Sequence, residues 1–155
     1  MATVDLTVAN AAGHQTRRGV KNAYTLQVQV TGAAAAAAKG SALAATDIIQ
    51  AIDLPADTLV IGATAKMTTA DTGTTLTFDI GTGGGDTFVD GGDGTTAGYL
   101  AEGTNGKLSA NGEVVAAADT LDITVATASS ANDDWVMEVT AFVMDITPVS
   151  NPGSA

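Results

Sequence analysis

Hydrophobic and polar residues alternate in several short stretches of the chain, with the two-residue period of a β-strand. The clearest stretches are Tyr24 to Val30, Leu76 to Ile80 and Leu121 to Val125. Because successive side chains of a strand point to opposite faces, each stretch predicts a strand with one face in the core. The threonines that alternate with the apolar residues are expected to be more exposed. The residues expected in the core are Leu76, Phe78, Ile80, Leu121, Ile123 and Val125.

The longest apolar run extends from Trp135 to Ile146 and predicts a central strand. Its odd-numbered positions are apolar as far as Val143, whereas its even-numbered positions become apolar only in the second half. This pattern predicts that one face is covered along most of the strand and that both faces are covered near its end. A partner subunit or a packed loop would cover the second face. The candidate interface residues on that face are Phe142, Met144 and Ile146.

Two other segments are less clear from the pattern. The alanine run 33–38 is shorter than the roughly 12–15 residues that a lone helix needs, so we expect a loop with about one helical turn. The segment 46–54 fits either an amphipathic helix or a strand. Clustered β-branched residues favour a strand, followed by a turn at Pro55 and a second strand to Met67.

Seven to nine short strands and no convincing long helix predict an all-β fold, an antiparallel β-sandwich of jelly-roll type with an extended N-terminal arm. The length of 155 residues fits one domain. We expect an arm over residues 1–22, the sandwich over 23–147 and a flexible tail over 148–155. No signal peptide or apolar run of about 20 residues is evident, so no membrane-spanning segment is expected.

The net charge of −11 disfavours nucleic acid and anionic membranes as partners. Three of the six basic residues, Arg17, Arg18 and Lys21, lie together in the arm. The arm is therefore either a frayed terminus or a basic segment that docks on an acidic neighbour. We favour an arm that reaches outward, in which the alternating residues Val4 to Val8 add a strand to a partner's sheet.

No set of residues in the sequence is suited to catalysis, so we expect no enzymatic activity and no cofactor. Cysteine is absent, and the single histidine, His14, has no second histidine or cysteine to work with. The glycine-rich stretch Gly83–Gly94 contains Asp86, Asp90 and Asp93, which are candidate ligands for a hard cation. Their spacing does not match an EF-hand, so the prediction is a solvated loop, pinned by Phe88 and Val89, without a metal.

Several stretches together resemble a known class of viral protein. They are Asp53–Ala63, Leu76–Thr82 with its glycine-rich loop, Ala118–Val125 and the final strand that ends in Met144-Asp-Ile146. In this order they resemble the capsid decoration or cement proteins of tailed bacteriophages, over about residues 47–147. The resemblance implies a β-sandwich that trimerises on the outer face of a capsid and bridges neighbouring shell subunits. It carries no catalytic residues.

The expected function is therefore that of a structural virion protein, a homotrimer bound to the major capsid protein on the outer capsid surface. The alternative is a head or tail fibre, or another adhesin, which would carry exposed aromatic residues or ligand-binding loops on a similar sandwich. The chain has one Trp, two Tyr and three Phe, and this small number weighs against a sugar-stacking site.

Overall fold

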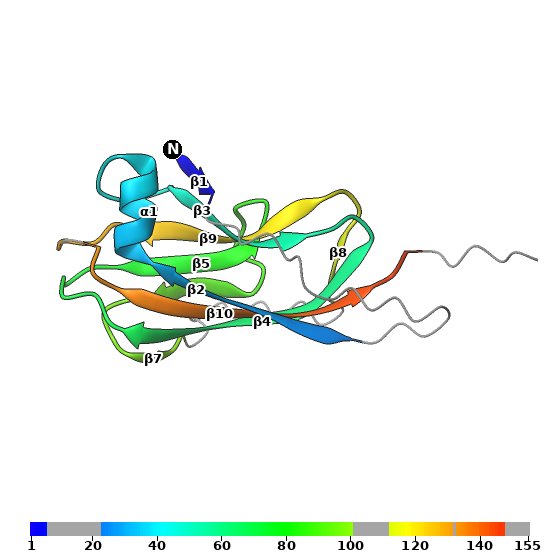
Figure 1. The fold of residues 1–155 in the computed structure, drawn as a ribbon. Helices are drawn as coiled ribbons and strands as arrows, with labels where there is room; N and C mark the ends of the chain where they lie inside the picture. The colour runs from blue at the N-terminus through cyan, green and yellow to red at the C-terminus, as the bar shows by residue number, and fades with distance from the viewer. Residues whose placement is uncertain (6–22, 101–111, 132, 148–155) are drawn as a thin grey trace, which may run out of the picture.

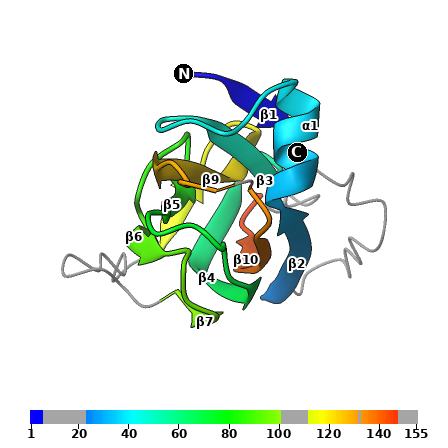
Figure 2. The same ribbon diagram turned by 90° about the vertical axis from the view of Figure 1, so that its left-hand side faces the viewer.

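The computed structural model describes residues 1–5, 23–100, 112–131 and 133–147. These residues form two β-sheets packed face to face, with one short helix beside them (Figure 1). The view along the strands in Figure 2 shows the two layers and the helix at one edge of the sandwich. The prediction of an all-β fold is confirmed.

The first sheet, called the β3–β9 sheet, has the strand order β1-β3-β9-β5-β6. Its strands are β1 (Thr3–Asp5), β3 (Ile48–Leu54), β9 (Asp119–Thr127), β5 (Thr77–Thr82) and β6 (Val89–Asp93). Its pairings are antiparallel except for β1 with β3, which is parallel.

The second sheet, called the β4–β10 sheet, has the strand order β2-β10-β4-β7, and β8 also pairs with β4. Its strands are β2 (Tyr24–Thr31), β10 (Val136–Asp145), β4 (Thr58–Thr69), β7 (Gly98–Tyr99) and β8 (Glu113–Val115). The final apolar run is thus a central strand, as predicted, and segment 46–54 supplies the strand β3.

The core lies between the inner faces of the two sheets. All six residues that were predicted to lie in the core are no more than 1% exposed. They are Leu76, which precedes β5, Phe78 and Ile80 of β5, and Leu121, Ile123 and Val125 of β9. Trp135 immediately precedes β10. The centroid of its ring lies 4.8 Å from the centroid of the Phe78 ring, in an edge-to-face arrangement. The odd-numbered positions of the final run from Trp135 to Val143 are also fully buried, so its inner face is the predicted one.

The threonines of β9 are expected to be more exposed than its apolar residues, but Thr120 is buried with 8% exposure, and the polar residue Asp122 beside it is 3% exposed. The loop after β5 folds back over this outer face, and the Gly84 amide donates to Asp122 Oδ2 at 2.7 Å. Gly84 has φ +73°, a left-handed conformation that favours glycine, and a Cβ there would also lie 2.6 Å from Ile48 Cδ1.

The glycine-rich stretch 83–94 therefore differs from the solvated loop that the sequence predicts, because its start packs against β9 and its residues Val89–Asp93 form the strand β6. Burial raises the pKa of the Asp122 carboxyl, although hydrogen bonds from Thr120 and Gly84 oppose the shift. Phe88 and Val89 are buried and pin the loop, as expected.

The alanine run forms a helix, α1 (Gly32–Lys39), which is longer than the single turn expected. Thr31 caps its N-terminus by accepting a hydrogen bond from Ala34, and Gly40 ends it in the left-handed conformation. Ala35 is fully buried. Caps and packing thus stabilise a helix that would be too short to form alone.

The first five residues belong to the sandwich, so the expectation that Val4 reaches outward is wrong. Val4 is 4% exposed, and Ile48 donates a backbone hydrogen bond to Ala2 at 2.9 Å. Ala2 in turn donates to Asp47 Oδ1 at 2.9 Å. The remainder of the expected arm, residues 6–22, and the expected tail, 148–155, lie outside the described residues.

Asp47 joins β1 to the helix, because its buried carboxylate also pairs with the Lys39 ammonium. Burial opposes ionisation, but hydrogen bonds from Lys39 and from the amides of Ala44 and Ala2 lower the pKa of the Asp47 carboxyl. A lowered pKa in the folded state means that Asp47 stabilises the fold above about pH 4, and that this contribution is lost as the pH falls further.

We therefore expect Asp47→Asn to reduce the free energy of unfolding by about 1–3 kcal/mol at neutral pH, where the ionised carboxylate accepts charged and neutral hydrogen bonds. The difference from the natural protein should shrink as the pH falls below about 4. Urea unfolding of both proteins across this range measures it. An equal difference at neutral and acidic pH would contradict the assignment.

Candidate assembly interface

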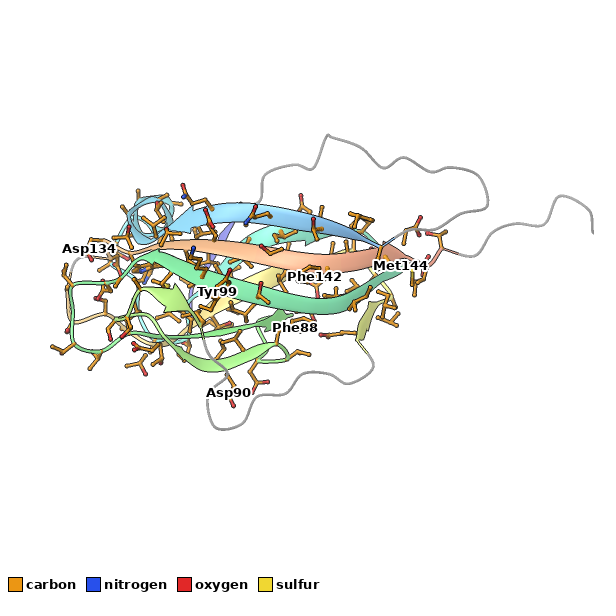
Figure 3. The ribbon with its side chains drawn as sticks, turned by 90° about the horizontal axis from the view of Figure 1, so that it is seen from below. Phe88, Asp90, Tyr99, Asp134, Phe142 and Met144 are labelled. Atoms are coloured by element: carbon orange, nitrogen blue, oxygen red, sulfur yellow. The ribbon has the colours of Figure 1, made fainter. Side chains whose placement is uncertain are left out.

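Along β10 and β4, the outer face of the β4–β10 sheet has a polar half and an apolar half, whereas the exposed residues of β2 on this face, Thr25, Gln27 and Gln29, are polar. In the polar half, Glu138 and Thr140 of β10 lie opposite Lys66 and Thr64 of β4. Further along the same strands, Phe142 lies opposite Gly62, and Met144 lies opposite Leu59. Figure 3, which looks onto this sheet from below, shows Phe142 and Met144 toward one end of the sandwich.

The apolar half forms a continuous surface across three strands. Val114, Leu59 and Met144 stand in one row, because Leu59 pairs with Val114 of β8 on one side and with Met144 of β10 on the other. Ile61 is the extra residue of a β-bulge, at which Phe142 pairs with Gly62 and Val143 with Val60. We call this surface the apolar outer patch; it consists of Leu59, Ile61, Val114, Phe142 and Met144.

The patch gathers most of the exposed apolar side chains of the described chain. Ile61 is 46% exposed, Val114 58% and Phe142 42%. Among the described residues, the exposed large apolar side chains outside the patch are Met1 and Tyr99. Scattered single apolar residues on a surface are ordinary, whereas a contiguous group marks a surface that binds another molecule.

Gly62 lies within this surface opposite Phe142, and because it has no side chain its backbone is not covered there. A Cβ added at Gly62 would meet no atom within 4 Å. The patch therefore has room for a side chain from a partner, and a side chain can be introduced at Gly62 without a clash inside the chain.

The structure brings together two of the interface residues predicted from the sequence and adds three others. Phe142 and Met144 lie in the patch, while Ile146 follows β10, is half-buried and donates its backbone N–H to the Asp57 carbonyl. Leu59, Ile61 and Val114 come from other strands. The sequence signal for a second apolar face on β4 is the run of three apolar residues Leu59-Val-Ile61, because consecutive strand residues cannot all face one core.

The other predicted interface residues, Arg17, Arg18 and Lys21, lie outside the described residues. Their docking on an acidic partner stays a prediction.

The two outer faces of the sandwich differ in charge. Asp53, Asp79 and Asp93 lie on the outer face of the β3–β9 sheet, opposite Thr120, Thr124 and Thr77 in register. Of the basic residues that the structure describes, Lys39 pairs with Asp47, and Lys66 lies opposite Glu138 on the other sheet. Contact between copies through the acidic face is therefore opposed by repulsion, and contact through the apolar outer patch is not.

The acidic residues of the glycine-rich loop do not converge. Asp93 accepts hydrogen bonds from the Thr95 amide and hydroxyl, at 2.8 and 2.7 Å. Within residues 1–5, 23–100, 112–131 and 133–147, no group of three or more acidic or histidine side chains is placed to hold a metal ion. The absence of a metal from this loop stays a prediction. In these same residues, no helix is long and apolar enough to cross a membrane.

The fold is similar to that of two chains from bacteriophage capsids. One belongs to a structure described as the capsid of Ralstonia phage GP4, with a TM-score of 0.60, 16% identity, and coverage of 95% of this chain and 100% of that chain. The other belongs to the cyanophage Pam1 capsid asymmetric unit, with a TM-score of 0.52, 17% identity, and coverage of 88% and 99%. At these identities the similarity is one of fold.

No protein-family model matches the sequence, and neither does any curated protein.

Proposed function

We propose that this protein is a non-enzymatic structural protein of a bacteriophage virion. In this proposal it decorates and cements the outer surface of the capsid as a homotrimer that bridges neighbouring subunits of the major capsid protein. The observation that carries the proposal is the apolar outer patch, an exposed apolar surface on a sandwich whose fold resembles those of two capsid chains. The resemblance of residues 47–147 to decoration proteins points the same way.

We also infer that the sandwich is a jelly roll. Eight strands divide into the orders β2-β10-β4-β7 and β3-β9-β5-β6, and all pairings among them are antiparallel. The chain passes to the opposite sheet between β2 and β3, β3 and β4, and β4 and β5. These features support two Greek keys wrapped into a double sheet, the arrangement of a jelly roll.

In this proposal the trimer forms through the apolar outer patch, which lies at one end of one outer face. Cyclic symmetry lets the same surface serve every copy, and the absence of charged side chains among its five residues avoids repulsion between acidic copies. The acidic outer face of the β3–β9 sheet then points away from the neighbouring copies.

The basic segment of residues 17–21 is proposed to contact the shell. Because residues 1–5 pack on the sandwich, deleting the whole arm would also remove β1. The sharper variant replaces Arg17, Arg18 and Lys21 with glutamine and leaves β1 in place. We expect normal folding, weaker attachment to shells and a smaller loss of attachment on raising the salt concentration than in the natural protein. Equal attachment at all salt concentrations would show that this segment does not dock.

A second candidate function is that of a fibre or adhesin, which is favoured by Tyr99. This residue is 75% exposed at the sheet edge, and the Lys66 ammonium lies 5.7 Å from its ring centroid. An exposed aromatic residue offers a stacking surface for a ligand. Loss of receptor binding in Tyr99→Ala, with shell attachment unaffected, would favour this alternative.

Cosedimentation with phage shells assembled without this protein tests the proposed function. We expect saturable binding in a fixed ratio to the major capsid protein, and greater resistance of the decorated shells to heat. Failure to bind such shells at any protein concentration would contradict the proposal.

A further inference from the structure

The strand β2 forms one edge of the β4–β10 sheet and lacks the features that usually protect an exposed edge (Figure 2). Natural edge strands are kept from pairing with other molecules by short length, charged residues, proline or bulges. β2 has eight residues, none of them charged or proline, and it pairs with β10 without a register shift. On its other side, no strand of the described chain pairs with it.

The other edges of the two sheets carry such protection. β1 has three residues, and β7 and β8, which both pair with β4, have two and three. β6 contains Asp90, Asp93 and two glycines, and its pairing with β5 has a register shift. Among the described strands, β2 is therefore the edge at which a long, regular strand can accept another strand.

The inner face of β2 is incompletely covered. Tyr24, Leu26 and Val28 pack on the core but are only half-buried, whereas Val30, close to the helix α1, is 2% exposed. The helix packs against both β1 and β2 and so covers the gap between the sheets at this end of β2. A further strand beside β2 would cover the three half-buried side chains and satisfy the backbone groups along the edge.

Charge favours a second copy of this chain as the source of that strand. The chain has a net charge of −11, and the edge strands β1 and β6 both contain aspartate. Two copies that approach through those edges therefore repel each other, whereas the residues of β2 are all uncharged. β2 is thus an edge at which two copies can meet without repulsion between opposing strands.

The residue pattern of β2 fits an antiparallel pairing with itself. Thr31 caps the helix α1, which leaves Tyr24–Val30 free to pair, and Gln27 is the middle of this stretch. A two-fold axis at Gln27 sets Leu26 opposite Val28 of the second copy. Apolar side chains then meet on the inner face, and the polar side chains of β2 meet on the outer face.

We propose that β2 pairs antiparallel with β2 of a second copy of this chain, about a two-fold axis at Gln27. The contact uses the same surface on both copies, so it closes after two. Two paired strands without a further packed layer are marginal in water, so the contact between free copies forms at high protein concentration. It does not depend on the proposed function; on a shell that carries trimers, it would join neighbouring trimers edge to edge.

The chain contains no cysteine, so a single introduced cysteine reports this pairing. Directly opposite residues of antiparallel strands have Cα atoms about 4.5–5.5 Å apart, within reach of a disulfide. At high protein concentration, Gln27→Cys should be oxidised to a covalent dimer at least about tenfold faster than the matched variant Gln29→Cys, whose counterpart would lie roughly 14 Å away. Both side chains are exposed on the same face of β2, so both variants should fold.

Amide hydrogen exchange of the natural protein gives a second readout. The β2 amides that point away from β10 should exchange more slowly as the protein concentration rises. Gln27→Lys, which sets like charges opposite each other, should abolish this dependence.

Two results would overturn the proposal. Equal oxidation rates of the two cysteine variants would show that the copies meet only by random collision. Protection of the outward β2 amides that does not change with concentration would show that residues 6–22 of the same chain cover the edge. Neither measurement uses shells, so a failure of the protein to decorate shells leaves both results unaffected.

Discussion

Replacing Phe78 with alanine should lower the free energy of unfolding by about 3–5 kcal/mol, because it leaves a cavity in the middle of the core. Phe78 is fully buried and its ring packs edge to face against Trp135, so the substitution removes contacts from both sheets. Native domains are stable by about 5–15 kcal/mol, so this is a large share of the total. For a chain of 155 residues, Tm should fall by roughly 6–20 °C.

Urea unfolding followed by circular dichroism measures this loss, and Thr77→Ala is the matched control. Thr77 is the neighbouring residue of β5, lies on the opposite face and is half-buried, so its loss should cost less than about 1 kcal/mol. An unchanged Tm for Phe78→Ala, or equal effects of both substitutions, would show that the faces of β5 are reversed.

Replacing Gly62 with lysine should convert the expected homotrimer into monomers. The substitution places a charge at the centre of the apolar outer patch, and burying that charge in a subunit contact is opposed by desolvation. A loss of about 3 kcal/mol per contact corresponds to about a hundredfold in Kd. The fold should be unaffected, because a Cβ at Gly62 meets no atom and its backbone is outside the left-handed region.

Thr64→Lys is the control for this experiment. Thr64 is two residues further along β4 on the same exposed face, in the polar half, opposite Thr140 of β10. Light scattering should give a trimer mass for the natural protein and for Thr64→Lys, and a monomer mass for Gly62→Lys. A monomer in all three cases at micromolar concentration would remove the patch as a contact between free copies, and a trimer in all three would place the contact elsewhere.

The elements that the sequence predicts well are those whose signal is local. The alternation in β2, β5 and β9 reports directly which side chains face the core, and the buried faces are the predicted ones. The helix α1 was underestimated because its stability depends on its flanks and contacts. Thr31 and Gly40 cap the helix, and the pairing of Lys39 with Asp47 is a tertiary contact that no local pattern reports.

The candidate interface could be predicted only in part, because a surface patch is assembled from strands distant in sequence. Phe142 and Met144 follow from the changing pattern of the last strand, whereas Val114 joins them only through the pairing of β8 with β4. β1 shows the same limit: Val4 has a strand pattern, but no local signal says that its partner is β3 of the same chain. Thr120 and Asp122 are buried by a loop whose path depends on Gly84.

Electron cryomicroscopy of phage shells, assembled without this protein and then mixed with it, tests the central claim most directly. The account predicts added density on the outer capsid surface, in which three sandwiches meet through their apolar outer patches and the acidic faces of their β3–β9 sheets point away from one another. Shells that carry no added density at saturating protein, or sandwiches bound singly with the patch facing solvent, would contradict it.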